Sequence, residues 1–220
     1  GLSPCEAYDL IWGDFLLARG WAFAVTDKAT RMVRADDAVY LPLDPEGHPA
    51  RWLGRLECLA RHARGELVRR AGRIPARTVA VGVSNGGYLV RRALEERPDL
   101  FDGGVELSGA LWRASGPSFL TQLPAALRCA ERGFSPESLK DAGLALPDGW
   151  GGLASFYRDF LWGPTLAYFL AHLDPEWRGD PARYDYAARP VAVRRAVQGL
   201  ECTGKLGKPL FSIAGEADLL

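Results

Sequence analysis

The segment Gly82-Val83-Ser84-Asn85-Gly86-Gly87 has the residue types and spacing of a serine nucleophile. It follows a short apolar run, residues 78–83, and precedes a stretch, residues 86–97, whose apolar positions have helical spacing. A G-x-S-x-G pattern in that setting predicts a sharp turn from a strand into a helix, with the serine hydroxyl exposed at the carboxyl end of the strand. We therefore expect Ser84 to be a catalytic nucleophile. The alternative is a glycine-rich turn with an incidental serine.

The neighbours of Ser84 have predicted supporting roles. The N-terminus of a helix favours negative charge, so the backbone N–H of Asn85 is the expected first donor to an oxyanion. Gly82 and Gly86 are expected to avoid side-chain clashes with the adjoining strand and helix. Leu2 and Ser3 are the two candidates for a second oxyanion donor.

The elements that must position this turn follow from apolar periodicity. Helical spacing over residues 9–20 and 51–70 predicts two further helices, which end at Gly20 and Gly72. Continuous apolar runs at residues 21–26, 78–83 and 209–214, with a weaker one at 104–108, predict strands that are covered on both faces. Strands that alternate with helices indicate parallel pairing and a three-layer α/β sheet.

The strand rhythm stops between residues 110 and 204. This interval is rich in aromatic residues at mostly helical spacing, and we expect a helical cap inserted between two parts of the core. The predicted units are a first core part at 1–109, the cap at 110–204 and the resumed core at 205–220. The aromatic side chains either pack the interior of the cap or line an apolar acyl or aryl pocket above Ser84, and both roles can coexist.

The sequence resembles the α/β-hydrolase superfamily over nearly its whole length. The stretch Val81 to Gly87, together with Thr26-Asp27-Lys28, is similar to bacterial hydrolases of the tannase/feruloyl-esterase-like and 3-hydroxybutyrate-oligomer hydrolase types. Fungal-type tannases and feruloyl esterases usually carry a cysteine directly before the nucleophile, where this sequence has Val83. Asp27 resembles the aspartate with which many hydrolases brace the nucleophile loop, and an ordinary turn-forming aspartate is the alternative.

The superfamily order of catalytic residues is serine, then an acid, then histidine. By this resemblance Asp218, just after the run at 209–214, is the expected acid, with Glu216 as the second choice. The sequence holds three histidines, His48, His62 and His172, all before the acid. We expect each to be a surface or packing residue, with His172 the least implausible base, and we expect the catalytic histidine to follow Leu220 in a fold truncated at both ends.

Composition excludes several function classes. Lys+Arg and Asp+Glu are equal at 27 each, so no net field attracts a nucleic acid. No stretch approaches 18 uninterrupted apolar residues, so we expect no membrane span. The four cysteines include no C-x-x-C pair, and we expect neither a metal nor a cofactor. Free thiols and one disulfide both stay open, and a secreted protein is favoured over a cytoplasmic one.

The sequence thus predicts a serine esterase that cleaves a small-molecule carboxylic ester through an acyl-enzyme. One alternative is an acyltransferase that uses the same nucleophile and passes the acyl group to an alcohol or thiol. A second alternative is a non-catalytic fragment or binding protein on a hydrolase scaffold, because the expected histidine is missing from the sequence.

Overall fold

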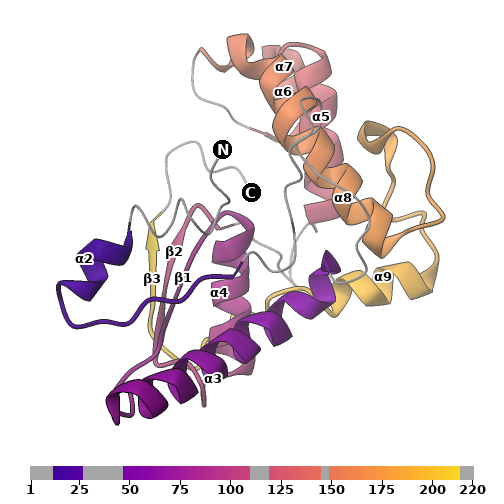
Figure 1. The fold of residues 1–220 in the computed structure, drawn as a ribbon. Helices are drawn as coiled ribbons and strands as arrows, with labels where there is room; N and C mark the ends of the chain where they lie inside the picture. The colour runs from indigo at the N-terminus through magenta and orange to yellow at the C-terminus, as the bar shows by residue number, and fades with distance from the viewer. Residues whose placement is uncertain (1–11, 27–46, 110–118, 145–148, 214–220) are drawn as a thin grey trace.

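The computed structural model describes residues 12–26, 47–109, 119–144 and 149–213 (Figure 1). The described residues form a small parallel sheet with two long helices against it, and a group of helices set apart from the sheet beyond α4 and α9. The chain is therefore of the α/β type, as the alternation of strands and helices predicts.

The sheet has three strands in the order β1-β2-β3, all parallel. They are β1 (Val79–Val83), β2 (Gly103–Leu107) and β3 (Leu210–Ile213). These elements confirm three of the predicted strands, including the one that follows the long helical interval. Because parallel strands share a direction, their carboxyl ends meet at one edge of the sheet. Ser84, directly after β1, and Ser108, directly after β2, lie at this edge.

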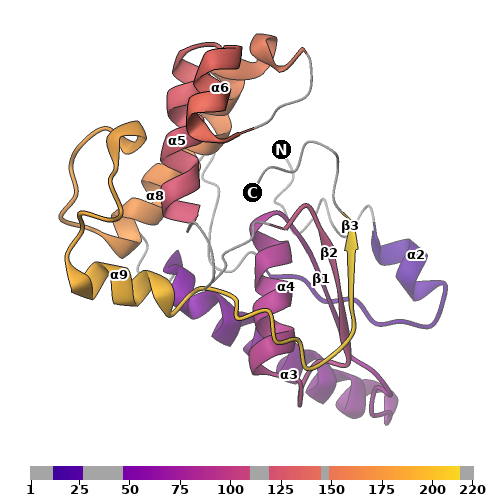
Figure 2. The ribbon, with the colours of Figure 1, turned by 180° about the vertical axis from the view of Figure 1, so that it is seen from behind.

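Two helices cover one face of this sheet (Figures 1 and 2). Helix α3 (Trp52–Ala71) follows the short 3-10 helix η3 (Pro49–Arg51) and ends at Gly72, whose φ of 61° is a left-handed helix stop. Helix α4 (Asn85–Glu96) begins directly after Ser84. It packs closely on β2, since a Cβ at Gly104 would lie 2.5 Å from a methyl carbon of Val90.

Among the described residues the opposite face of the sheet is largely exposed, so the predicted cover on both faces of the strands is found on one face only. Val81 is 53% exposed and Phe211 is 64% exposed, whereas Ala80, on the face toward α4, is buried. An apolar run indicates that a strand can be covered, but which face is covered depends on the helices that pack on it. In the described residues those helices lie on one side.

The prediction of a strand at residues 21–26 is wrong. These residues form neither strand nor helix, and Trp21 is 44% exposed. A strand needs a partner edge for its backbone hydrogen bonds, and hydropathy alone does not supply one. The expected helix before it is represented by α2 (Asp14–Leu17), and the chain turns at Gly20 with a φ of 76°.

The described residues between β2 and β3 form helices and turns and contain no strand. They form α5 (Phe119–Glu131), α6 (Pro136–Ala142), η4 (Trp150–Leu153), α7 (Ala154–Phe156), the π-helix η5 (Tyr157–Trp162), α8 (Gly163–Leu173), η6 (Pro181–Arg183) and α9 (Val191–Gln198). Fully buried side chains such as Leu120, Leu166 and Phe169 give these helices a hydrophobic core of their own. The division of the chain into a core and an inserted cap stays a prediction.

This helical core continues into the first turns of α3 and α4. The Trp52 ring lies 5.8 Å from the Phe169 ring and 6.4 Å from the Tyr88 ring, centroid to centroid. The Tyr88 hydroxyl donates a 2.5 Å hydrogen bond to the Leu200 carbonyl, just after α9. Because α4 begins where β1 ends, these contacts attach the helices of residues 119–198 near the carboxyl edge of the sheet.

Among the described residues, no helix is both long enough and apolar enough to cross a bilayer.

Candidate active site

Ser84 occupies a tight turn between β1 and α4. Its φ of 53° and ψ of −120° lie outside the regions that L-residues ordinarily adopt, and the residue is exposed. Its N–H donates to the Leu107 carbonyl at 2.9 Å, and its carbonyl accepts from the Tyr88 N–H at 3.2 Å. Neighbouring strand and helix thus hold the backbone in a strained conformation of the kind that gathers at functional sites.

Two glycines make this turn sterically feasible. A Cβ at Gly82 would overlap the Gly86 carbonyl, and a Cβ at Gly87 would lie 2.7 Å from the Gly109 Cα. The predicted role of Gly82 therefore has a direct steric basis. Gly86 differs, because a Cβ there would meet nothing within 4 Å. The crowded glycine on the helix side is Gly87, which the pattern analysis did not single out.

The first turn of α4 presents backbone donors next to Ser84. Within the described part of the chain, the N–H groups of Asn85, Gly86 and Gly87 donate to no backbone carbonyl. Such unpaired N–H groups at a helix start, together with the helix dipole, favour an anion. The Asn85 N–H therefore lies in the turn from which an oxyanion donor would act, and its role stays a prediction.

A buried carboxylate lies behind this turn. Glu106, the fourth of the five residues of β2, is 2% exposed and receives two hydrogen bonds from the Arg91 guanidinium of α4. The Ser212 hydroxyl of β3 donates a third, at 2.6 Å. Sequence reasoning missed this group, although a single charged residue inside an otherwise apolar strand was a usable signal.

Ser108 is a second serine in a left-handed conformation. It follows β2 with a φ of 48°, is exposed, and its N–H donates to the Ile213 carbonyl at 2.8 Å. It thus lies at the same sheet edge as Ser84. No helix begins at Ser108 or Gly109.

The three histidines have other surroundings. His62 is exposed on α3. His48 precedes η3 and His172 lies in the last turn of α8, and their rings are 5.4 Å apart, centroid to centroid. Burial lowers the pKa of His48, which favours its neutral form, and its Nδ1 accepts from the Ala50 N–H at 3.1 Å. The structure brings two histidines together and shows no hydrogen bond between any of the three and Ser84.

Several predicted site residues lie outside the described part of the chain. They are the brace Asp27, the acid Asp218 with its second choice Glu216, and the oxyanion candidates Leu2 and Ser3. Their roles stay predictions.

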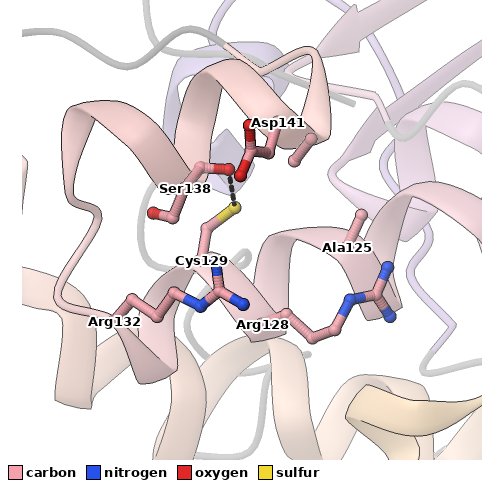
Figure 3. Close-up of a pocket in the computed structure, with 7 residues that line it drawn as sticks. Ala125, Arg128, Cys129, Arg132, Ser138 and Asp141 are labelled. Atoms are coloured by element: carbon pink, nitrogen blue, oxygen red, sulfur yellow. Dashed lines mark hydrogen bonds between the residues drawn. The ribbon is translucent and has the colours of Figure 1, made fainter.

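Two cavities lie among the helices of residues 119–198. One of them, of about 160 Å³, lies between α5 and α6, and Arg128, Arg132 and Asp141 are among the residues that line it (Figure 3). The Cys129 thiol at its wall donates to the Ser138 carbonyl at 3.1 Å, and burial raises the pKa of this thiol. A second cavity of about 210 Å³ lies beside Tyr184. Neither is lined by residues of β1 or α4.

Among the described residues the potential metal ligands are dispersed and the cysteines are free. Within these residues no group of three or more His, Cys, Asp or Glu side chains is arranged to hold a metal ion. Cys58, Cys129 and Cys202 are free thiols.

We compared the chain with protein-family models, with curated proteins and with solved structures, and no match was found.

Proposed function

We propose that the protein is a serine hydrolase that cleaves a carboxylic ester through an acyl-enzyme on Ser84. The backbone of Ser84 is the observation that carries this proposal. An exposed serine is held at a φ of 53° between a parallel strand and a helix, at the cost of strain that an ordinary surface turn does not need. This arrangement supports the nucleophile role that the G-x-S-x-G pattern predicts.

The chemistry follows from the groups around the turn. The Ser84 Oγ attacks the ester carbonyl carbon while a histidine base, which in this proposal is none of His48, His62 and His172, accepts the hydroxyl proton. The negative charge that develops on the carbonyl oxygen is stabilised by the N–H of Asn85 and its neighbours at the start of α4. The alcohol then leaves with the proton, and a water molecule hydrolyses the acyl-enzyme by the same steps.

The remaining residues of the proposed mechanism come from the family resemblance. Asp218 is the proposed carboxylate that orients the histidine and stabilises the imidazolium. Asp27 is the proposed brace of the nucleophile turn. The helices of residues 119–198 attach near the same sheet edge, where a cap would border the substrate site.

A covalent probe tests the nucleophile. The protein is treated with a fluorophosphonate, and adducts are located by mass spectrometry of its peptides. We expect an adduct on the peptide that contains Ser84, its loss in Ser84→Ala, and its retention in Ser108→Ala. Ser108 is the matched control because it is an exposed serine with a similar φ at the end of the next strand.

A folded full-length protein that forms no adduct at Ser84 would contradict the proposal and favour a non-catalytic binding protein. Turnover of p-nitrophenyl acetate by the full-length protein, which carries the histidine base, gives the second measurement, and Ser84→Ala is expected to lower it by at least about a thousandfold. Transfer of the acetyl group to an added alcohol in preference to water would instead favour the acyltransferase.

A further inference from the structure

Glu106 is a charged side chain buried in a strand where an apolar one would ordinarily pack. It is 2% exposed, and in the sheet it lies beside Gly82 of β1 and Ser212 of β3. It faces α4, because Arg91 of that helix donates to both of its carboxylate oxygens. A buried ion pair costs desolvation that can exceed its attraction, so its presence is weak evidence for a stabilising role.

The contacts of Glu106 converge on the turn that holds Ser84. A Cβ added at Gly87 would lie 3.3 Å from the Glu106 Cβ, and one added at Gly109 would lie 2.8 Å from its Oε2. The Glu106 side chain therefore fills the space against the first turn of α4. The next residue, Leu107, accepts the Ser84 N–H at 2.9 Å. One strand segment thus touches both the nucleophile and the helix turn behind it.

The three hydrogen bonds on the carboxylate also fix it from two directions. Arg91 lies on the second turn of α4 and its side chain is 24% exposed, while the Ser212 hydroxyl approaches from β3 at 2.6 Å. Arg91 and Ser212 thus occupy three of the roughly four acceptor positions of this carboxylate, which leaves it little capacity to orient a histidine. The carboxylate can instead set the distance and tilt between α4 and the sheet, on which the position of Ser84 relative to the N–H groups of α4 depends.

We propose that Glu106, through Arg91 and the first turn of α4, is a positioning residue for the Ser84 nucleophile. This inference rests on the proposed function, and it adds a residue that acts from behind the nucleophile without touching the substrate.

The first test separates positioning from stability. Glu106→Gln keeps the shape of the side chain and removes its charge, so Arg91 loses its ion pair. We expect kcat for p-nitrophenyl acetate to fall about tenfold or more while KM stays within about twofold, since small misplacements of reacting groups cost rate. Glu95→Gln is the matched control. Glu95 also ties α4 to a neighbouring segment, by accepting from the N–H groups of Thr203 and Gly204 at the far end of the helix.

Glu95→Gln is expected to lower the melting temperature without lowering kcat. Equal losses of kcat in the two variants, or a loss of stability alone in Glu106→Gln, would overturn the positioning role.

The second test measures the ionisation of a thiol at position 84 and does not depend on ester hydrolysis. In a Ser84→Cys protein, alkylation of the introduced thiol by iodoacetamide is followed against pH for the peptide that contains it, with the exposed Cys58 as internal reference. The N–H groups of α4 stabilise a thiolate there. If Glu106 positions the turn, adding Glu106→Gln moves the alkylation midpoint to higher pH, because the thiolate loses those donors.

The direction of this shift distinguishes positioning from simple electrostatics. Loss of a nearby negative charge by itself favours a thiolate and would move the midpoint to lower pH. A lower or unchanged midpoint therefore overturns the proposal. The two proposals can also fail separately. If the protein with Ser84 shows neither ester hydrolysis nor a fluorophosphonate adduct, the proposed function is wrong. A higher midpoint on adding Glu106→Gln to Ser84→Cys would still support the positioning role of Glu106.

Discussion

Two glycines of the Ser84 turn are tightly packed against backbone atoms, and a third is not. Gly82 and Gly87 leave room for backbone atoms that approach from α4 and from Gly109, whereas Gly86 faces open space. The two named glycines of the G-x-S-x-G pattern are therefore not equivalent in this protein. One is required for close packing, and the other could accept a methyl group.

We expect Gly82→Ala to lower the free energy of unfolding by about 1–3 kcal/mol, as overpacking does, because its Cβ would overlap the Gly86 carbonyl. Gly86→Ala is the matched control. It is expected to be neutral or to stabilise the protein by up to about 1 kcal/mol, since alanine is the better helix former at an unstrained helical position. Urea unfolding of both variants measures the difference. Equal destabilisation would show that the turn is crowded on both sides.

At the scale of elements, α4 joins the sheet to the segment that follows α9. Arg92 donates to the Gly199 carbonyl at 3.0 Å and Tyr88 to the Leu200 carbonyl at 2.5 Å. Burial, followed by the negative charge of Glu95, raises the pKa of the nearby Cys202 thiol to about 12. Burial also raises the pKa of the Tyr88 hydroxyl above its ordinary value of 10.0. The Cys202 thiol and the Tyr88 hydroxyl therefore keep their protons in the folded protein to higher pH than they would in water.

We predict that the protein loses stability as pH rises above about 9. The folded state keeps the proton on Cys202 up to a pKa of about 12, whereas an unfolded thiol releases it near 9.0. Between these values the folded state binds more protons than the unfolded state, so the free energy of unfolding falls with pH. Stability from this thiol is present in full below pH 9 and is lost by about pH 12.

Urea unfolding at pH 7, 9 and 10 in wild type, Cys202→Ala and Cys58→Ala measures this dependence. Cys202→Ala is expected to flatten the alkaline decline, and Cys58→Ala, at an exposed thiol, is expected to leave it unchanged. A decline of the same slope in all three proteins would place its origin elsewhere.

At the scale of the whole molecule, one face of the described sheet is buried and the other is exposed. Leu94 of α4 is fully buried against one face, while Phe211 and Val81 are 64% and 53% exposed on the other. The contribution of an apolar side chain to stability follows the area that it removes from water. Chemically similar residues on the two faces should therefore differ strongly in their effect on folding.

We expect Leu94→Ala to lower the free energy of unfolding by about 2–5 kcal/mol, as is usual for a buried leucine. Phe211→Thr, which keeps a side chain suited to a strand, is expected to change it by less than about 0.5 kcal/mol. Denaturant titration of both variants checks this contrast. A large loss in Phe211→Thr would mean that the open face is covered in solution.

Local patterns in the sequence were enough to predict the strand-to-helix turn. A strand of β-branched residues, a G-x-S-x-G segment and a helix with one apolar side are properties of neighbours in sequence, so the position of Ser84 between β1 and α4 could be predicted. The parallel direction of β1, β2 and β3 could be predicted for the same reason, because each pair of strands is separated by helical chain.

Other features depend on residues that are distant in sequence, and only the tertiary structure decided them. Residues 21–26 have the hydropathy of a strand but find no partner edge, and the apolar strands are covered on a single face. The carboxylate of Glu106 meets Arg91 of α4 and Ser212, 106 positions later, because β2 lies between β1 and β3. Sequence patterns report what a segment can bury, whereas the packing of distant segments decides what it does bury.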